Sequence, residues 1–157
     1  MIVLMVIHIS HYQINKRRKQ FTTSSIQTNN IMKDKLYKVN EFHKVFKIGD
    51  APNEPTLINI KDYNLRYELM REENYEYLDA CADNDLIEVA DALGDQLYIL
   101  CGTILKHGMQ HKIEEVFNEI HRSNMSKLDE NGEPIFRSDG KVLKGVNYFK
   151  PDIKKCL

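Results

Sequence analysis

The strongest constraint on the fold is a break of three residues, Asp83-Asn84-Asp85, between two long segments of helical character. The segment after the break, residues 86–100, consists mainly of Leu, Ile, Val and Ala and has no Lys or Arg. Asp and Asn side chains readily cap the helix that follows them. Because so short a connection makes adjacent helices pack antiparallel, the sequence predicts a helical hairpin.

Two further helices are expected, one on each side of this hairpin. Asp34 can cap the first and Gly49 can stop it, while Gly108 takes the C′ position after the hairpin's second helix. The helical patterns span residues 34–48, 61–82, 86–107 and 111–123. The remaining tail has turn signals, with a small β-hairpin predicted around Ser138-Asp139-Gly140. These patterns predict an all-α fold: an antiparallel bundle of about four helices with an extended, hairpin-forming C-terminal tail.

The N-terminal 31 residues differ in character from the rest of the chain. They contain no Asp or Glu and four basic residues, which leaves 18 basic and 23 acidic residues, a net charge of −5, in residues 32–157. Their apolar run of nine residues, MIVLMVIHI, is too short for a membrane span, which needs roughly 20. We expect 1–31 to be a disordered or spurious extension, with a targeting segment as the alternative. We expect 32–157 to form one domain.

Composition excludes several classes of partner. The formal net charge of the whole chain is −1, so no basic field favours a nucleic-acid polymer, and no segment predicts insertion into a membrane. The three cysteines, Cys81, Cys101 and Cys156, are far apart and form no CxxC pair. This pattern is typical of reduced thiols in a cytoplasmic protein.

Carboxylates interrupt the apolar second helix of the predicted hairpin. At about 100° per residue, Glu88, Asp91 and Asp95 fall within roughly 60° of one another on that helix. The rest of the helix is apolar almost all round, so these three residues form a narrow polar stripe. Such a stripe favours a ligand-binding role over simple exposure to water.

The first helix of the hairpin carries a matching set of carboxylates. Glu72, Glu76, Asp79 and Asp83 share one arc of this helix, and Glu73 lies within about 60° of Glu76. Folding the hairpin can bring Glu73 and Glu76 opposite Asp91 and Asp95. Because clustered like charges repel one another, a set of hard oxygen ligands is best stabilised by Mg²⁺ or Mn²⁺.

Two simpler interpretations compete with the metal site. We expect Asp79, Asp83 and Asp85 to face water, as most helix-surface carboxylates do. A pair of carboxylates can also perform acid–base chemistry without a metal, as in glycosidases. Five or six clustered carboxylates exceed what such a pair requires.

The same residues carry a family resemblance. The segments EENYEYLDA and DLIEVADALGDQLYIL resemble the MazG-like, all-α nucleoside triphosphate pyrophosphohydrolases, and in particular the phosphoribosyl-ATP pyrophosphohydrolase-like group. The signature of that family is ExxE on one helix followed by ExxD on the next. Glu73 and Glu76 match ExxE, and Asp95 matches the Asp of ExxD. Ala92 stands where the family has the Glu, while Glu88-Val89-Ala90-Asp91 reads ExxD one turn earlier.

The resemblance implies an activity and a set of roles. It implies Mg²⁺-dependent cleavage of a nucleoside triphosphate to the monophosphate and pyrophosphate, in a homodimer or homotetramer. The metal ligands would be Glu73, Glu76, Asp91 and Asp95, with Glu88 assisting, and Glu72 or Glu76 would take the proton of the attacking water. The candidate substrate-binding residues lie near the end of the fourth helix and in the tail, and they are Arg122, Asn124, Lys127, Lys141 and Lys144.

Rival interpretations of the same hairpin stay open. Ala92 favours a non-catalytic, nucleotide- or metal-binding assembly module that has kept the hairpin and lost turnover. A regulatory protein that senses nucleotides without hydrolysing them is a second possibility. A di-iron carboxylate protein would need Glu-x-x-His pairs on its helices, and the carboxylate stretch 72–95 contains none.

Overall fold

The computed structural model describes residues 31–157, and these residues are all-α, as predicted. After a helix at residues 31–45, the chain forms α2 (Ile60–Ala82), α3 (Leu86–Lys106), α4 (Ile113–Met125) and the short 3-10 helix η1 (Ile153–Cys156). The predicted extension 1–31 lies, except for Ile31, outside the described residues. None of the described helices is long and apolar enough to cross a membrane.

The chain divides into two compact units, which we describe separately. The first holds the chain up to Asp50 together with Glu73–Gly102, and the second holds Ala51–Glu72 together with Thr103–Leu157. The helices α2 and α3 each run from one unit into the other. The expectation of a single domain over 32–157 stays a prediction.

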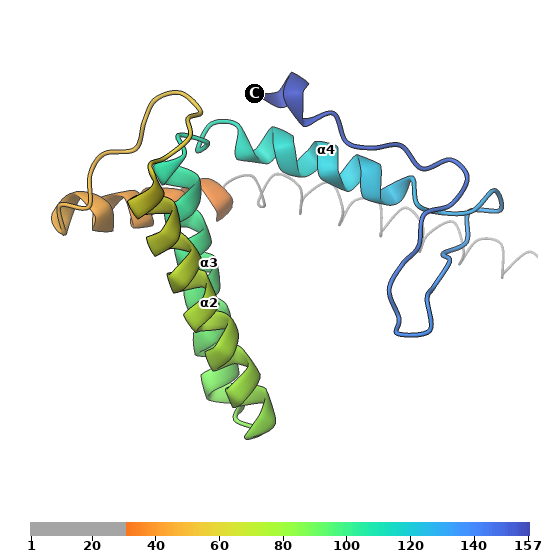
Figure 1. Cartoon of the computed structure of the whole chain (residues 1–157), viewed down its shortest axis with the longest axis horizontal. Coiled ribbons are helices and arrows are strands. Elements are labelled where there is room, and N and C mark those ends of the chain that lie inside the picture. The colour runs from red at the N-terminus through yellow and green to blue at the C-terminus, as the bar shows by residue number, and fades with distance from the viewer. Residues whose placement is uncertain (1–30) are drawn as a thin grey trace, which may run out of the picture. The chain divides into compact units, whose positions relative to one another are not determined.

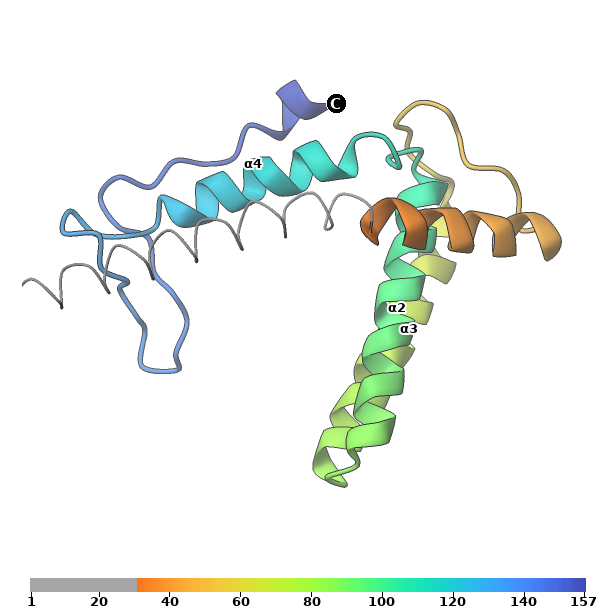
Figure 2. The ribbon, with the colours of Figure 1, turned by 180° about the vertical axis from the view of Figure 1, so that it is seen from behind.

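The helix ends follow from short-range chemistry. Asn84 has a positive φ of 56°, and the backbone N–H of Asp85 donates to the carbonyl of Ala80 at 3.0 Å, which ends α2 in a Schellman-type turn. The Asp85 carboxylate then accepts hydrogen bonds from the backbone N–H groups of Ile87 and Glu88, at 2.9 and 3.2 Å. The break therefore caps both helices, and the predicted antiparallel hairpin of α2 and α3 is confirmed (Figures 1 and 2).

Glycine is required at one of the predicted stops. Gly108 follows α3 with φ of +66°, and a Cβ at this position would lie 2.2 Å from the carbonyl oxygen of Glu54. The first helix differs from its prediction at both ends. Residues 31–33 are already helical, so Asp34 lies inside the helix and does not cap it, and the helix ends at residue 45 instead of about 48. Its left-handed residue is Lys47, with φ of 56°, and the N–H of Ile48 reaches back to the carbonyl of His43 at 2.8 Å. That bond closes the helix before Gly49.

Side-chain hydrogen bonds between α2 and α3 show their register. In the first unit, the side-chain amide of Gln96 donates to the backbone carbonyl of Glu73 at 3.2 Å. In the second unit, Arg66 Nε donates to the hydroxyl of Thr103 at 3.0 Å. Seven residues separate the two bonds along each helix, so both belong to one antiparallel register.

The C-terminal tail is extended and packs along α4 within the second unit (Figure 1). The Ser123 hydroxyl donates to the carbonyl of Phe149 at 2.8 Å, and the N–H of Phe149 donates to the hydroxyl of Ser126 at 3.2 Å. An isolated antiparallel bridge joins Phe136 and Val142, which confirms the small hairpin predicted around Ser138-Asp139-Gly140.

Candidate functional site

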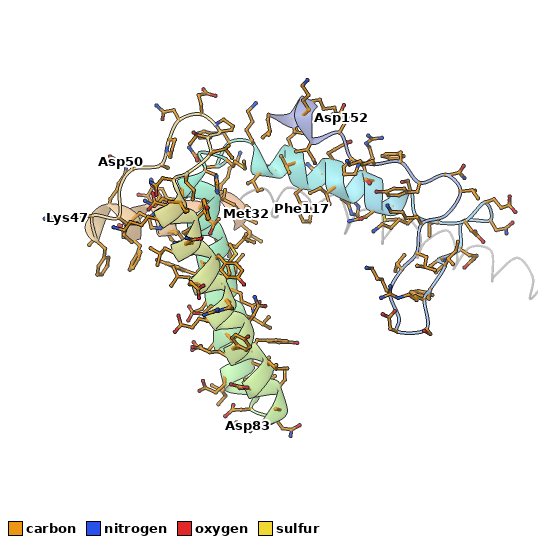
Figure 3. The ribbon with its side chains drawn as sticks, viewed as in Figure 1. Met32, Lys47, Asp50, Asp83, Phe117 and Asp152 are labelled. Carbon is orange, nitrogen blue, oxygen red and sulfur yellow. The ribbon has the colours of Figure 1, made fainter. Side chains whose placement is uncertain are left out.

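An acidic hollow lies between α2 and α3 near the closed end of the hairpin, where Figure 3 labels Asp83. Its volume is about 430 Å³. Besides the buried Ala80, it is lined by six carboxylates, namely Glu76, Asp79, Asp83, Asp85, Glu88 and Asp91. All six are exposed to solvent. Hard oxygen donors dominate this surface, and no basic side chain lines it.

Part of the predicted ligand set lines the hollow. Glu76, Glu88 and Asp91 come together there from facing helices, as their positions on the two helices predict. The aspartates predicted to face water, Asp79, Asp83 and Asp85, are exposed but line the same hollow. For Asp79 and Asp83 the sequence carried a signal, because they share the helical arc of Glu76. For Asp85 the sequence predicted a helix cap that faces water, and no pattern linked it to Glu76.

Glu73 and Asp95 lie elsewhere on the hairpin. Neither lines the hollow; Glu73 is half-buried on α2 and Asp95 is exposed on α3. The bond from Gln96 to the Glu73 carbonyl places the residue after Asp95 directly against Glu73. Within residues 31–157, no three His, Cys, Asp or Glu side chains lie close enough to hold one metal ion. The four-ligand set therefore stays a prediction.

Ala92 is buried, with 2% of its surface exposed. It lies one turn before Gln96 on the face of α3 that packs against α2, so a longer side chain at this position would point into the hairpin. The family resemblance places a glutamate here. The methyl group of Ala92 instead contributes apolar contact to the hairpin and supplies no ligand.

The predicted substrate residues belong to the second unit, and Arg122 has a clear structural role there. Its Nε and NH2 groups donate to both carboxylate oxygens of Glu119, at 2.9 and 2.8 Å, and its guanidinium lies 4.2 Å from the centre of the Phe149 ring. These contacts join α4 to the tail. The ammonium of Lys144 similarly lies 4.3 Å from the centre of the Tyr148 ring.

Glu119 is the buried anchor of this arrangement, with 6% of its surface exposed. Besides the Arg122 bonds, its carboxylate accepts a hydrogen bond from the backbone N–H of Asp152 at 2.8 Å. It also forms an ion pair with the ammonium of Lys155 at 3.3 Å. The hydrogen bonds from Arg122, followed by the one from Asp152, lower the pKa of Glu119 to about 2. Sequence reasoning missed Glu119, since nothing in a local pattern shows that a helix-surface glutamate will be covered by the tail.

The remaining candidates Asn124, Lys127 and Lys141 lie at the end of α4 and in the tail. Asn124 and Lys141 are exposed and Lys127 is half-buried. The carbonyl of Lys127 accepts a hydrogen bond from the N–H of Gly145 at 2.9 Å, which ties the start of the tail to its later part. The side chains of Asn124 and Lys141 are therefore open to a ligand.

Thiol chemistry does not fit the three cysteines. Cys101 and Cys156 are each 1% exposed. Burial raises the pKa of both thiols, which disfavours the reactive thiolate. The exposed Cys81 lies on α2 outside the lining of the acidic hollow. The carboxylates of the hairpin therefore remain the candidate site residues.

Comparison with known proteins identifies the family. The family model described as phosphoribosyl-ATP pyrophosphohydrolase matches residues 39–124, more than half of the chain. The chain therefore belongs to the phosphoribosyl-ATP pyrophosphohydrolase family, as its resemblance predicted. The matched range includes every carboxylate of the hairpin and ends at Asn124, before the tail.

Two individual relatives accompany the family match. The chain is 31% identical over 143 residues to the uncharacterized protein L479 of Acanthamoeba polyphaga mimivirus. That alignment covers 87% of this chain, and the chain spans about half, 51%, of the length of that relative. A solved structure of a candidate NTP pyrophosphohydrolase from Exiguobacterium sp. 255-15 is 23% identical to this chain, with a TM-score of 0.40. The match covers 77% of this chain and 92% of the chain in that structure.

Proposed function

We propose that this protein hydrolyses a nucleoside triphosphate, or a phosphoribosyl-ATP-like nucleotide, to the monophosphate and pyrophosphate in a reaction that requires Mg²⁺, with Mn²⁺ as an alternative. The observation that carries this proposal is the family match, because residues 39–124 contain the whole carboxylate-bearing hairpin. The acidic hollow supports it, since six carboxylates line one cavity without a basic neighbour.

The donor chemistry of the hairpin fits Mg²⁺. Carboxylate oxygens are the ligands that this hard cation prefers, and exposed carboxylates allow it to keep several water ligands. We propose Glu73, Glu76, Asp91 and Asp95 as the residues that would hold the metal, with Glu88 assisting. A bound Mg²⁺ would supply positive charge to the phosphate oxygens and lower the pKa of a bound water.

The chain's own residues would then supply the general base. We assign the general base to Glu76, which lines the hollow, with Glu72 one turn earlier as the alternative. The base accepts a proton from the attacking water as the new bond to the α-phosphorus forms. The bond from the α-phosphorus to the bridging oxygen then breaks, and pyrophosphate leaves. Both metal binding and base function require ionised carboxylates, so activity should fall at low pH.

For substrate binding we propose residues of the second unit. Lys127, Lys141 and Lys144 would contact phosphate oxygens, and Asn124 would hydrogen-bond the base or sugar of the nucleotide. Arg122 would act in part through its bidentate contact with Glu119, which orders the end of α4. Its guanidinium also carries donors beyond those two, because the group has five N–H bonds.

We further propose that the protein is a cytoplasmic homodimer or homotetramer. Free cysteines at positions 81, 101 and 156 suit a reducing compartment. Large apolar side chains remain exposed on the hairpin, among them Leu78 at 59% and Leu86 at 79%. Large apolar side chains left exposed in this number favour a protein–protein contact.

A non-catalytic assembly module is the second candidate, and the burial of Ala92 favours it. At 2% exposure, this residue leaves the family's glutamate position without a carboxylate. Such a module would bind nucleotide or metal through the hollow without turnover.

Pyrophosphate release distinguishes the two functions. The assay uses canonical and modified nucleoside triphosphates plus phosphoribosyl-ATP, with Mg²⁺, with Mn²⁺ and with a chelator. We expect metal-dependent release, and we expect Glu73→Gln and Asp95→Asn each to lower kcat/KM by at least about 100-fold, because each removes a metal ligand. Glu130→Gln, an exposed change in the tail, serves as the matched control. Folded protein that binds nucleotide and releases no pyrophosphate from any substrate would establish the module instead.

A further inference from the structure

The C-terminal tail is fastened to α4 at two places (Figure 1). The first fastening is the carboxylate of Glu119, and each of its oxygens has two partners. One oxygen accepts from Arg122 and from the backbone N–H of Asp152, both at 2.8 Å. The other accepts from Arg122 Nε at 2.9 Å and pairs with Lys155 at 3.3 Å. Because a buried carboxylate is costly without such partners, this set of contacts holds the tail at one point of α4.

The second fastening lies just beyond the C-terminal end of α4. The N–H of Gly145 donates to the carbonyl of Lys127 at 2.9 Å. The approach is close, because a Cβ at Gly145 would lie 2.1 Å from the carbonyl oxygen of Leu128. Between the two fastenings, the hydroxyl of Ser126 accepts a hydrogen bond from the N–H of Phe149 at 3.2 Å. This part of the tail therefore follows one defined path along the end of the helix.

That path brings polar and basic residues from distant parts of the sequence together. Lys144 directly precedes Gly145, so the bond from Gly145 makes Lys144 a backbone neighbour of Lys127. The carbonyl of Asn124, in the last turn of α4, accepts a hydrogen bond from the N–H of Lys127 at 3.2 Å. The ammonium of Lys144 is exposed and lies over the Tyr148 ring. Two lysines and an amide side chain thus start from adjacent backbone positions, and ammonium groups bind phosphate oxygens well.

Arg122 belongs to the fastening more than to this polar surface. It is the basic residue in the last turn of α4, and its Nε and NH2 groups both donate to Glu119. The face of its guanidinium covers the Phe149 ring at 4.2 Å. A guanidinium held by a bidentate carboxylate and an aromatic ring has a fixed position. Its main task is therefore to hold the tail against α4.

We propose that Glu119 is a positioning residue of the substrate site: by docking the tail through Arg122, it keeps Lys144 beside Lys127, where the two ammonium groups bind phosphate oxygens of the nucleotide. Glu119 itself does not touch the substrate, because its carboxylate is buried and both oxygens are engaged. The inference deepens the proposed function and rests on it.

A loosened tail should weaken substrate binding and leave the chemical step unchanged. The proposed metal ligands and the proposed base lie on α2 and α3, not on the tail. Ordering a mobile lysine on binding costs free energy, so loss of the fastening should raise KM. A change that raises KM at constant kcat removes binding that substrate and transition state share.

A double-mutant cycle on the full chain tests whether Glu119 acts through Lys144. With Mg²⁺ and the best nucleotide substrate, we expect Glu119→Gln and Lys144→Ala each to raise KM by at least about fivefold, with kcat changed by less than about twofold. The double variant should resemble Lys144→Ala alone. Effects on KM that multiply in the double variant would overturn the proposal, as would a fall in kcat as large as the rise in KM. Glu130→Gln, an exposed loss of the same charge, should change neither constant.

Arg122→Lys separates positioning from direct binding by charge. The lysine keeps the positive charge and loses the bidentate contact with Glu119. We expect it to raise KM as much as Glu119→Gln does, with helical content by circular dichroism unchanged in both. An Arg122→Lys variant with the KM of the unmodified chain would show that charge at position 122 suffices, and it would overturn the positioning role.

Calorimetric titration with pyrophosphate and Mg²⁺ distinguishes failure of this inference from failure of the proposed function. We expect Glu119→Gln and Lys144→Ala each to raise the dissociation constant of pyrophosphate by at least about fivefold, and Glu130→Gln to leave it unchanged. A chain that hydrolyses no nucleotide and still shows this pattern would overturn the hydrolase and support the positioning role. Pyrophosphate binding that is equal in all four proteins, or absent from all of them, would overturn the positioning role whether or not nucleotide is hydrolysed.

Discussion

At the scale of single residues, Ala92 is where this chain departs from the ExxD signature that its resemblance implies. The position is buried on the inner face of α3, so its side chain is surrounded by the hairpin instead of water. A glutamate at such a position would need a cation nearby, because a buried, unpaired carboxylate costs several kcal/mol. Ala92 avoids that cost.

Ala92→Glu should therefore make stability depend on metal. We expect the variant to lose more than about 2 kcal/mol of unfolding free energy in chelator, and to recover most of that loss in millimolar Mg²⁺. Thermal unfolding with and without Mg²⁺ measures both effects. Ala92→Gln has the same size without the charge, and it should lose stability without recovering it. Equal stability of Ala92→Glu in chelator and in Mg²⁺ would show that a carboxylate at position 92 does not bind the metal.

Glu119 determines how firmly the tail is held, also at the residue scale. Its folded pKa of about 2 lies below the ordinary glutamate value. Its contribution to stability is therefore complete above that ordinary value, and it is lost as the pH falls toward 2. Cys156 reports the same contact, because it lies in η1 of the tail, is buried, and its thiol lies 3.9 Å from the carbonyl of Glu115 on α4.

Glu119→Gln should loosen the tail at neutral pH. We expect a lower unfolding free energy and faster labelling of Cys156 by a thiol reagent, measured in a Cys81→Ser background. The stability difference from the unmodified chain should shrink as the pH falls from 5 toward 2. Protonation of Glu119 in the unmodified chain then removes the same negative charge that the substitution removes. Glu130→Gln, an exposed change in the tail outside the Arg122 contact, is the control. A difference that stays constant down to pH 2 would contradict the assigned role.

At the scale of elements, the hairpin is held by local caps and by contacts across its two helices. Asp85 has two possible roles, since its carboxylate caps α3 and also lines the acidic hollow. The two roles differ in what they require. Capping needs an acceptor oxygen, whereas cation binding needs a negative charge.

Asp85→Ala should cost about 1 kcal/mol of unfolding free energy through loss of the cap. Asp85→Asn keeps the acceptor oxygen and should be close to the unmodified chain in stability. Urea unfolding of both variants measures the difference. If Asp85→Asn were as unstable as Asp85→Ala, charge would matter more than the hydrogen bonds, and the capping account of this residue would be wrong.

At the scale of the whole molecule, charge and exposed apolar surface both bear on the proposed cation and the proposed self-association. Residues 32–157 carry a net charge of −5, so an anionic nucleotide would be repelled without a bound cation or basic residues close by. The exposed start of α3 indicates a protein contact as well. The proposed metal would offset the negative charge, and the proposed self-association would cover exposed apolar side chains.

The sequence by itself determined α2, α3 and α4 and the approximate positions of their ends. The periodicity located α2, α3 and α4 within about two residues, and Asp85 and Gly108 marked their caps correctly. These features were predictable because helix propensity and capping depend on residues within four or five positions along the chain. The family was likewise readable, because its ExxE motif lies within one turn of a helix.

The tertiary structure decided which side chains meet. It brought Asp79, Asp83 and Asp85, which are exposed as predicted, together on the lining of the acidic hollow. It also buried Ala92 between helices and gave Arg122 a partner in Glu119. These outcomes depend on the register of α2 against α3 and on the path of the tail over α4. Both are set by contacts between residues distant in sequence, which no local pattern encodes.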